Sequence, residues 1–461
     1  APGLDELGVF LPYSPLHHIL LQDFGGPVVA TSGNISGEPV ITDDGEARHR
    51  LLGIADALLS HDRPILRPAD DPVQRIIAGR PRTIRVGRGL APLELDLPKT
   101  LDRPMLATGG QMKSAIALGF ERRAVLSPHI GELDTRRGLD VFRQVVADLQ
   151  TLHQTRAATL VCDLHPGFTA RRWAEAQGPP VVAVQHHVSH ASAIAGEYPD
   201  VENWLVFAWD GVGLGSDGDL WGGETFAGAP GRWQRVASLR PFHLLGGDRA
   251  AREPWRSAAG LMWEEGLEWR PPEDVPSGPA RQAWAQRINT HRTSAVGRLF
   301  DAAACLVLGI ERVSFEGQGP MLLEAAADGT GDSEAVPLPL RPDGSGLLRA
   351  DWSPLLPVLT DQKRSAMERA AILHESLAVQ IADQVKTLAT RINIDAVGLT
   401  GGVFQNKYLA EWAIKLLEAA GFRALLPAVI PANDGGLAYG QLIEVLYGGG
   451  TPVGMKTGTG N

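Results

Sequence analysis

Short apolar runs alternate with amphipathic stretches along most of the chain, a pattern typical of α/β proteins. Compact apolar runs predict buried strands, and apolar residues recurring every three or four positions predict helices. The strands expected beyond residue 100 are Met105–Thr108, Ser114–Leu118, Thr159–Asp163, Val181–Val184, Leu205–Asp210 and Val397–Thr400. The helices expected there are Gly138–His153, Ala295–Leu308, Met367–Arg391 and Asn406–Ala420.

Two of these strands open similar units. Met105–Thr108 leads through a glycine-rich turn into a second strand, and Leu205–Asp210 is followed by the glycine-rich string DGVGLG. Two such openings predict an internal duplication, in which each half has its own sheet and helices. We expect surface loops at Pro271–Pro279 and Pro337–Ser353, where prolines interrupt any regular period.

The N-terminal part of the chain has weaker patterns. Val28–Thr31 is expected to be a buried strand, Glu46–Leu59 a helix and Thr83–Val86 a strand. The stretch Ala91–Pro104 holds three prolines in the string APLELDLPKTLDRP and no sustained period, so it predicts a domain boundary. We therefore expect one domain over residues 1–97, a linker over 98–104 and a larger domain of two α/β lobes over 105–461.

Composition narrows the class of protein. The chain has 461 residues, of which 44% are hydrophobic and 21% charged, which suits a globular protein of two or three domains. A net charge of −10 argues against bulk binding to nucleic acid or to anionic membranes. Two cysteines, no recognisable signal peptide and no apolar run long enough for a membrane helix favour the cytoplasm.

One segment departs from the acidic balance. His61–Leu90 contains seven arginines and three aspartates. This excess of positive charge is compatible with a solvated basic face, or with a pocket for an anion such as a nucleotide phosphate.

The string VQHHVSH carries the strongest sign of metal chemistry. His186 and His190 are four residues apart, which places both imidazoles on one face of a helix that follows a strand. His187 would point elsewhere, towards a substrate or a supporting group. Asp210 and Asp434 each follow a strand and could complete the site, although both also suit ordinary turns or helix caps. Two histidines with carboxylates are compatible with iron, manganese or zinc.

Glycine-rich loops suggest a nucleotide site. Gly213 lies in DGVGLG, and Gly401 and Gly402 in TGGVFQN, where backbone N–H groups could approach a phosphate. Asp301, in GRLFDA, would lie on a helix and contact a ribose. This combination suggests a two-lobed, actin-like fold, and the absence of a Walker A string argues against a P-loop NTPase.

A second set of polar side chains occurs in the N-terminal part. Ser32 and Asn34 lie in TSGNISGEP, directly after the expected strand Val28–Thr31. They could contact a ligand, or simply satisfy the backbone of their own turn.

Many ordered strings resemble those of one family, the HypF carbamoyltransferases of nickel–iron hydrogenase maturation. The matching strings are LPYSPLHH, TSGNISGEP, HDRPI, DDPV, GRGLAP, LSPHIGELD, CDLHPGF, VQHHVSH, DGVGLGSDGDLWGGE, GGDRAAREPWR, GRLFDAAA, FEGQGPMLLE, TGGVFQN and PANDGG. The resemblance covers essentially the whole chain. It implies part of a YrdC-like α/β domain, followed by a duplicated TsaD-like domain of the actin/Hsp70 (ASKHA) class.

The resemblance also implies an activity. In this family the YrdC-like domain uses ATP with Mg²⁺ to convert carbamoyl phosphate into carbamoyl-adenylate. The TsaD-like domain, which holds one transition metal (iron or zinc), then transfers the carbamoyl group to the C-terminal cysteine of HypE, a step towards the cyanide ligands. No nucleic acid or membrane takes part.

By the same resemblance, particular residues acquire roles. His186, His190, Asp210 and Asp434 match metal ligands, and Asp301 matches the position that contacts the ribose. The nucleotide loops correspond to Gly213, Gly401, Gly402 and Asn406, and the pair that contacts ATP in YrdC-like domains corresponds to Ser32 and Asn34. No general base is assigned, and His187 and Glu224 are the candidates.

The chain also departs from the family pattern. The acylphosphatase domain, the zinc fingers and the opening of the YrdC-like domain are missing, and Pro72 stands where the family usually has serine. We therefore expect transfer to be intact and adenylation to be incomplete in this chain alone. Two alternatives remain open: an O-carbamoyltransferase acting on a small-molecule hydroxyl, and a non-catalytic fragment that binds nucleotide and docks on HypE.

Overall fold

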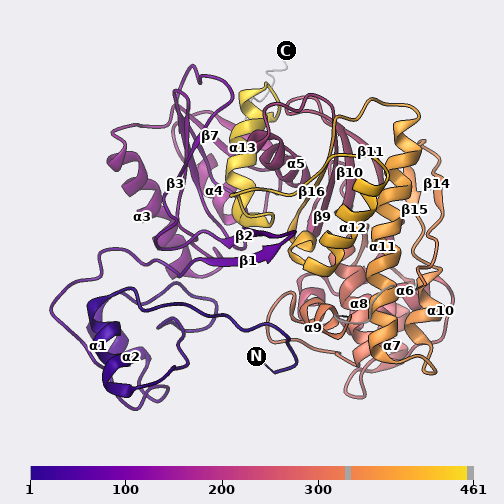
Figure 1. Ribbon diagram of the computed structural model, residues 1–461, viewed down its shortest axis with the longest axis horizontal. Coiled ribbons are helices and arrows are strands. Elements are labelled where there is room, and N and C mark those ends of the chain that lie inside the picture. Colours follow the sequence, from indigo (N-terminus) through magenta and orange to yellow (C-terminus); the bar gives the residue numbers. More distant parts are fainter. Residues whose placement is uncertain (1, 328–333, 454–461) are drawn as a thin grey trace, which may run out of the picture.

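The computed structural model describes residues 2–327 and 334–453 of the chain. Two α/β lobes, each built on a mixed sheet, make up most of the molecule. The N-terminal residues form a smaller region beside the first lobe, at the lower left of Figure 1. The predicted α/β class is therefore confirmed. None of the helices described combines the length and the apolar character needed to cross a membrane.

The first lobe contains a seven-stranded sheet with the order β18-β8-β7-β4-β5-β6-β3. Its strands are β3 (Leu93–Asp96), β4 (Met105–Ala107), β5 (Ala117–Phe120), β6 (Arg123–Leu126), β7 (Thr159–Asp163), β8 (Val181–Val184) and β18 (Thr451–Val453). Its helices are α3 (Arg136–Leu152), α4 (Thr169–Glu175), α5 (His186–Glu197) and α13 (Leu437–Leu446). The strands β4, β7 and β8 run parallel, whereas β4, β5 and β6 form an antiparallel meander.

The second lobe contains a nine-stranded sheet whose main path is β14-β15-β11-β10-β9-β16-β17. Its strands are β9 (Trp204–Leu214), β10 (Leu220–Gly228), β11 (Gln234–Leu239), β12 (Phe242–Leu245), β13 (Thr290–Thr293), β14 (Leu340–Pro342), β15 (Leu348–Ala350), β16 (Ala396–Thr400) and β17 (Ala424–Leu425). Its helices are α6 (Trp255–Glu264), α7 (Ser277–Ala285), α8 (Val296–Leu308), α9 (Gln318–Ala327), α10 (Leu355–Thr360), α11 (Ala366–Ala389) and α12 (Lys407–Ala419).

The two sheets share one topology, which supports the predicted duplication. The path β8-β7-β4-β5-β6 in the first lobe corresponds to β17-β16-β9-β10-β11 in the second. In both, three parallel strands adjoin an antiparallel meander. The helices α5 and α13 pack against each other between the sheets, with α5 facing β9 and α13 facing β4 and β7 (Figure 1). The carboxyl ends of both sets of parallel strands therefore lie near the starts of these two helices.

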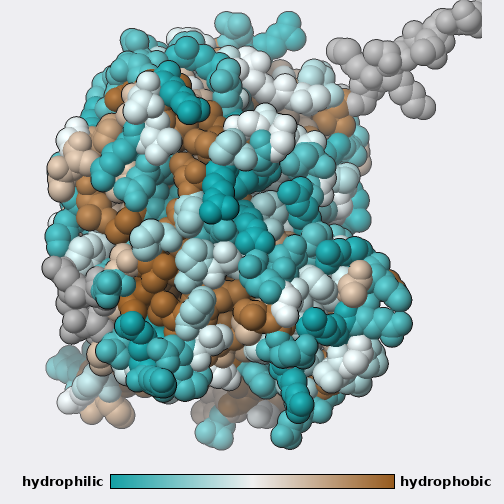
Figure 2. All heavy atoms as spheres, turned by 90° about the vertical axis from the view of Figure 1, so that its right-hand side faces the viewer, coloured by the Kyte–Doolittle hydropathy of each residue, from teal (hydrophilic) through white to brown (hydrophobic). Residues whose placement is uncertain are grey.

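The surface of the second lobe is mixed in character. Figure 2 shows hydrophobic patches separated by hydrophilic side chains on the face that lies at the right of Figure 1. The N-terminal region also exposes large apolar side chains, since Val9, Leu11 and Val29 are 80%, 81% and 104% exposed.

Several local predictions in the N-terminal region were wrong. Val28–Thr31 is not a strand, because none of the residues that the structure describes pairs with it. The helix expected over Glu46–Leu59 is the shorter α2 (Asp44–Arg50), which ends before Gly53, whose φ of 90° a helix cannot accommodate. The strand expected at Thr83–Val86 is confirmed as β2 (Arg80–Arg85), paired with β1 (Val73–Ile77). Ahead of these elements lies α1 (Pro15–Phe24).

Three further differences lie in the lobes. The strand β9 continues to Leu214, so the first five residues of DGVGLG are extended strand rather than a turn. The expected loop Pro337–Ser353 contains the β14–β15 hairpin, and α7 begins inside the loop expected at Pro271–Pro279. The strand β3 lies ahead of the predicted linker 98–104 and nevertheless pairs with β6 of the first lobe. The domain boundary itself stays a prediction.

Candidate metal and nucleotide site

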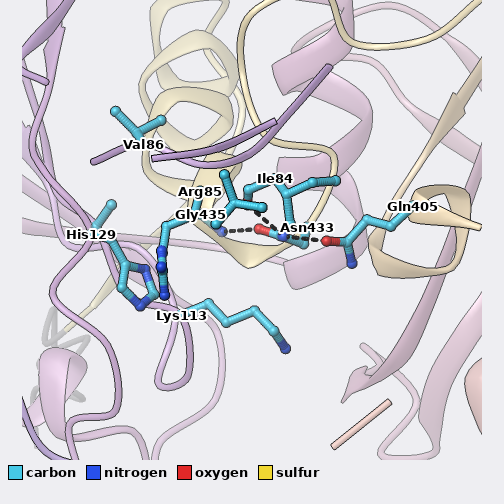
Figure 3. Close-up of a pocket in the computed structure, with 10 residues that line it drawn as sticks. Ile84, Arg85, Val86, Lys113, His129, Gln405, Asn433 and Gly435 are labelled. Carbon is cyan, nitrogen blue, oxygen red and sulfur yellow. Dashed lines mark hydrogen bonds between the residues drawn. The ribbon is translucent and has the colours of Figure 1, made fainter. Parts of the chain in front are cut away.

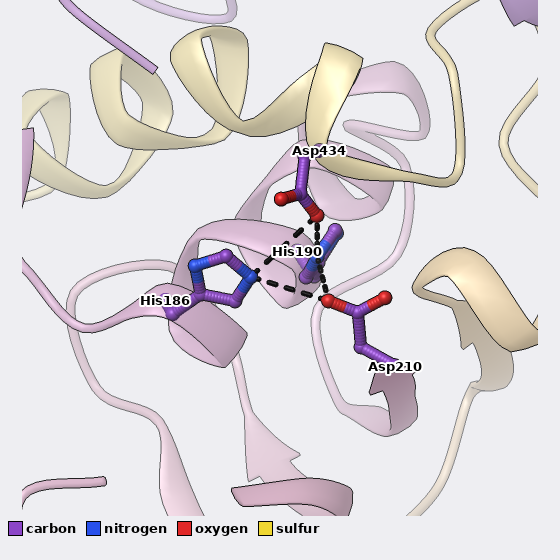
Figure 4. A group of neighbouring side chains, drawn as sticks. All are labelled: His186, His190, Asp210 and Asp434. Atoms are coloured by element: carbon purple, nitrogen blue, oxygen red, sulfur yellow. Dashed lines mark hydrogen bonds and ion pairs between the residues drawn. The ribbon is translucent and has the colours of Figure 1, made fainter. Parts of the chain in front are cut away.

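Four side chains meet between the lobes: His186, His190, Asp210 and Asp434. One possible ligand atom of each lies within 4.8 Å of the other three (Figure 4). His186 Nε2 is 3.2 Å from Asp210 Oδ2 and 3.6 Å from Asp434 Oδ1. His190 Nε2 is 3.5 and 3.6 Å from the same two oxygens. The structure thus brings together the four residues that the sequence predicted as ligands, and we call this group the HHDD cluster.

The members of the cluster come from α5, from β9 and from the turn ahead of α13. The strand β8 leads directly into α5, whose first residue is His186 and whose N-cap Gln185 accepts from the Val188 N–H. One turn later, His190 lies on the same face of the helix. Asp210 lies on β9, and Asp434 begins the short 3₁₀ helix η3 (Asp434–Gly436) ahead of α13. The convergence therefore follows from the shared topology of the two lobes.

A fifth side chain, the carboxylate of Asp163, supports the cluster from behind. His186 Nδ1 lies 2.8 Å from Asp163 Oδ2 at the end of β7. A proton on Nδ1 donated to Asp163 leaves the lone pair of Nε2 directed at the other ligand atoms. We did not predict Asp163 from the sequence, although its position at the carboxyl end of an apolar strand was a usable signal.

The two glycines of TGGVFQN hold Asp210 in place. The Gly402 N–H donates to Asp210 Oδ1 at 3.0 Å, which leaves Oδ2 for the cluster. Gly401 has a φ of 94°, and a Cβ there would lie 2.1 Å from the Trp209 carbonyl oxygen. A Cβ on Gly402 would lie 2.7 Å from Asp210 Oδ1. These glycines therefore allow the close approach of η2 (Gly402–Gln405) to β9.

The charges in the cluster compensate one another. Burial opposes protonation of His186 and His190, but the neighbouring carboxylates outweigh it and raise the pKa of both imidazoles. Burial and Asp210 oppose ionisation of Asp434, but the two imidazoles outweigh them and hold its pKa at about 2. In the absence of a metal the cluster is therefore held together by protons, which a divalent cation would replace.

The donor set fits a transition metal. His190 Nε2 is buried and has no hydrogen-bond partner, although two carboxylate oxygens lie near it. A buried polar atom without a partner is unfavourable unless something else satisfies it. Two imidazole nitrogens and two carboxylate oxygens suit iron, manganese or zinc.

The two candidate bases occupy different surroundings. His187 is buried, and burial followed by the charge of His186 holds its pKa well below the ordinary value. Its Nε2 has no hydrogen-bond partner, so a neutral imidazole is available next to the cluster. Glu224 instead accepts from Arg235 Nε at 2.6 Å and from the Ser294 hydroxyl. These two contacts are those of a structural carboxylate, which favours His187 of the two.

The predicted nucleotide residues are only partly brought together. A Cβ on Gly213 would lie 2.8 Å from the rings of both His186 and His187, so this glycine lies against the cluster. Asp301 is buried on α8, and its Oδ2 lies 3.0 Å from Arg298 Nη1. Burial raises the pKa of Asp301 to about 7. Asn406 caps α12 and donates to His374 Nε2, so its side chain is already engaged.

Ser32 and Asn34 lie elsewhere, in an exposed turn. The Ser32 hydroxyl donates to Asn34 Oδ1, and the Asn34 amide donates to the carbonyls of Ile35 and Glu38 at 3.0 Å each. Among the described residues, these bonds satisfy polar groups of the turn itself, which was the alternative to ligand contact considered from the sequence. Their role in binding ATP stays a prediction.

A cavity of about 200 Å³ lies where the β1–β2 hairpin meets the lobes. Figure 3 shows Arg85, His129 and Lys113 around it, with Asn433 and Gln405 on the other side. Asn433 and Gly435 flank Asp434, so the cavity adjoins the HHDD cluster. Arg85 belongs to the basic segment for which we considered an anion pocket.

Comparison with known proteins identifies the family. A family model described as "Carbamoyltransferase, Kae1-like Domain, second subdomain" matches residues 206–441, and one described as "HypF Kae1-like domain" matches residues 100–197. The chain belongs to the HypF carbamoyltransferase family. A third model, described as "Telomere recombination" and covering the Sua5, YciO and YrdC proteins, matches residues 1–87. The predicted YrdC-like and TsaD-like (Kae1-like) domains are therefore confirmed as domain types.

Individual HypF relatives agree with the family assignment. Carbamoyltransferase HypF of Rhodobacter capsulatus is 43% identical over 96% of this chain and 60% of its own length. A carbamoyltransferase HypF homolog of Cupriavidus necator is 34% identical over 73% of this chain and 90% of its own length. The chain thus spans about 60% of the length of the longer HypF relatives that it matches.

Two solved HypF structures share the fold. A full-length HypF in a phosphate- and nucleotide-bound form superposes with a TM-score of 0.90 at 30% identity, over 96% of this chain and 60% of that one. The HypF of T. kodakarensis superposes with a TM-score of 0.89 at 28% identity, over 97% of this chain and 61% of that one. The arrangement of both lobes and of the N-terminal region is therefore that of the HypF family.

Proposed function

We propose that this protein is a metal-dependent carbamoyltransferase of hydrogenase maturation, which transfers the carbamoyl group of carbamoyl-adenylate to the C-terminal cysteine of HypE. The observation that carries the proposal is the HHDD cluster, in which four predicted ligands converge between the lobes of a HypF-family chain. Carbamoyl phosphate and ATP with Mg²⁺ would be the ultimate substrates, and the metal would be iron or zinc. Both cysteines of the chain are free and buried, which suits the cytoplasm.

In the transfer step, the thiolate sulfur of the acceptor attacks the carbamoyl carbon. The bond from that carbon to the phosphate oxygen breaks, so that a thiocarbamate forms and AMP leaves. A metal held by His186, His190, Asp210 and Asp434 would supply positive charge that orients the donor and polarises it. The Gln185 amide donates to His187 Nδ1 at 3.2 Å, so the neutral imidazole carries its proton on Nε2, which we propose donates a hydrogen bond to the reacting groups rather than accepting a proton from the thiol.

The same chain residues would hold the nucleotide part of the donor. We propose that Asp301 contacts the ribose and that Gly213, Gly401, Gly402 and Asn406 line the nucleotide loops. Ser32 and Asn34 would contact ATP during formation of the adenylate.

The transfer step can be tested apart from adenylation. Pre-formed carbamoyl-adenylate and purified HypE are supplied to the protein, and the C-terminal peptide of HypE is examined by mass spectrometry. We expect a carbamoyl adduct on the terminal cysteine with the wild-type protein and not with His186→Ala or His190→Ala, which should also lose bound metal. Retention of stoichiometric metal by both variants would contradict the ligand assignment. A missing adduct, with nucleotide still bound, would instead favour a small-molecule acceptor or a docking role.

A further inference from the structure

A lysine from the first lobe reaches towards the HHDD cluster. Lys113 lies in the loop between β4 and β5 with a φ of 48°, a left-handed conformation that is uncommon for residues other than glycine. The backbone on its C-terminal side is fixed, because the Ser114 N–H donates to the Gly131 carbonyl at 2.9 Å and the Ser114 carbonyl accepts from Ile130. The backbone therefore directs the Lys113 side chain into the cavity, as Figure 3 shows.

The ammonium group of Lys113 joins the two lobes. Its Nζ is 3.1 Å from Glu316 Oε2, and Glu316 lies in the segment between α8 and α9 of the second lobe. Glu316 Oε1 is 3.8 Å from Arg298 Nη2, and Arg298 Nη1 is 3.0 Å from Asp301 Oδ2. A chain of alternating charges thus runs from the cavity to the residue proposed to contact the ribose.

The cavity favours a further anion. Among the described residues that line it, Lys113 and Arg85 carry positive charge and none is a carboxylate, whereas burial and these two cations lower the pKa of His129 to about 4 and keep it neutral. Asp210 and Asp434 lie close enough that their charges, with that of Glu316, raise the pKa of Lys113 in spite of its burial. Those two carboxylates belong to the HHDD cluster, so Glu316 is the partner that an incoming anion would displace.

We infer that Lys113 binds the phosphate group of the adenylated donor, taking an anionic oxygen in exchange for Glu316. The inference rests on the proposed function, since it assumes a donor with a phosphate group between the lobes. When the bond between carbamoyl carbon and phosphate oxygen breaks, the electron pair stays on the AMP phosphate, whose added charge Lys113 stabilises. Lys113 keeps its proton throughout, so the step needs no further proton donor.

Binding of AMP and of adenosine, measured by calorimetry on the metal-loaded protein, tests this contact. Lys113→Met should weaken AMP binding about 10- to 100-fold, the loss expected for one charge-assisted hydrogen bond, and leave adenosine binding nearly unchanged. Lys113→Arg should retain most of the AMP affinity. Glu316→Gln should tighten AMP binding several-fold, because the ammonium group no longer has to leave a carboxylate.

Controls separate this contact from general damage to the site. Lys99→Met removes a lysine that lies on the ring of Tyr447, outside the cavity lining, and should change neither affinity. Metal content should be the same in the wild type and in Lys113→Met. An unchanged ratio of AMP to adenosine affinity in Lys113→Met would overturn this inference and leave the proposed function standing. Failure of the metal-loaded wild-type protein to bind either compound would contradict both.

Discussion

At the scale of single residues, the HHDD cluster depends on groups that hold its members in place. Asp163 fixes the ring of His186, and the Gly402 N–H holds one oxygen of Asp210 so that the other faces the cluster. Removal of a group that holds a metal ligand in place typically lowers metal affinity about 10- to 100-fold. Two substitutions outside the ligand set should therefore affect metal binding.

The first substitution is Asp163→Ala. It removes the acceptor of the His186 Nδ1 proton and leaves all four ligand atoms present, so the imidazole can turn or change tautomer. We expect metal affinity to fall about 10- to 100-fold, measured by competition with a chelator. The matched control is Glu264→Ala, which removes the carboxylate partner of His243 away from the cluster. Equal affinity of the wild type and Asp163→Ala would contradict the supporting role.

The second substitution is Gly402→Ala. The added Cβ would lie 2.7 Å from Asp210 Oδ1, so the carboxylate or the loop must move. Metal affinity should fall about tenfold or more while the protein remains folded, as a metal titration monitored alongside circular dichroism can show. Gly344→Ala is the control, because nothing lies within 4 Å of a Cβ at that position. A decrease of the same size in Gly344→Ala would mean that the effect is not specific to Asp210.

At the scale of elements, sequence patterns predicted only part of the lobes, namely four of the helices and strands at or near β4, β5, β7, β8, β9 and β16. Each of the four expected helices begins and ends within two residues of an observed helix: α3, α8, α11 or α12. Long amphipathic segments are predicted this closely because their apolar residues recur with a clear helical period. Among the strands that were not predicted, β3 alternates apolar and acidic residues over only four positions, and β14 and β15 are short and lie among prolines and glycines. Val28–Thr31 fails for the opposite reason, since its apolar pattern has no neighbouring strand.

The contact between α11 and α12 predicts a dependence of stability on pH. His374 on α11 is buried, its Nδ1 lies 2.7 Å from the Ala370 carbonyl, and its Nε2 accepts from Asn406. Burial lowers the pKa of His374 to about 4, below the roughly 6.5 of an unfolded histidine. Between pH 6.5 and pH 4, this histidine is protonated in the unfolded chain and neutral in the folded protein. The free energy of unfolding therefore decreases as pH falls through that window, by up to about 3 kcal/mol.

Urea unfolding at pH 7 and pH 5 measures this effect. The wild type should lose free energy of unfolding between the two values, and His374→Gln should lose less, because its side chain does not titrate. His291→Gln, at an exposed position, should behave as the wild type does. The assignment fails if His374→Gln shows the same pH dependence as the wild type.

At the scale of the whole molecule, the site depends on segments that are distant in the sequence. Lys113 and Glu316 are separated by 203 positions, and the cavity combines the β1–β2 hairpin with residues of both lobes. The ligands of the HHDD cluster could be predicted because two histidines lie four residues apart at the start of an expected helix and each aspartate follows an apolar run in the sequence. The cavity and the Lys113–Glu316 ion pair could not be predicted, since they depend on how close the lobes and the hairpin lie.

Arg75 fixes the hairpin to the second lobe together with Ala78 and Arg82, and its removal should loosen that contact. Arg75 Nη1 lies 2.9 Å from both Glu324 and the Gln405 carbonyl, next to the loop that holds Asp210. Arg75→Ala leaves Glu324 largely buried without its cation, so we expect the protein to lose about 2 kcal/mol or more of stability. Amide hydrogen exchange should rise over residues 73–85.

Arg67→Ala is the matched control for Arg75→Ala, because it breaks a more exposed ion pair, with Asp148 on α3, and should have little effect. Measuring metal affinity as well shows whether Arg75→Ala affects only the hairpin or also the HHDD cluster. The four ligands all come from the lobes, so Arg75→Ala should keep its metal while residues 73–85 exchange faster. If exchange over these residues did not change, contacts other than Arg75 would hold the hairpin. If metal were lost as well, the hairpin would be part of what keeps the lobes together around the cluster.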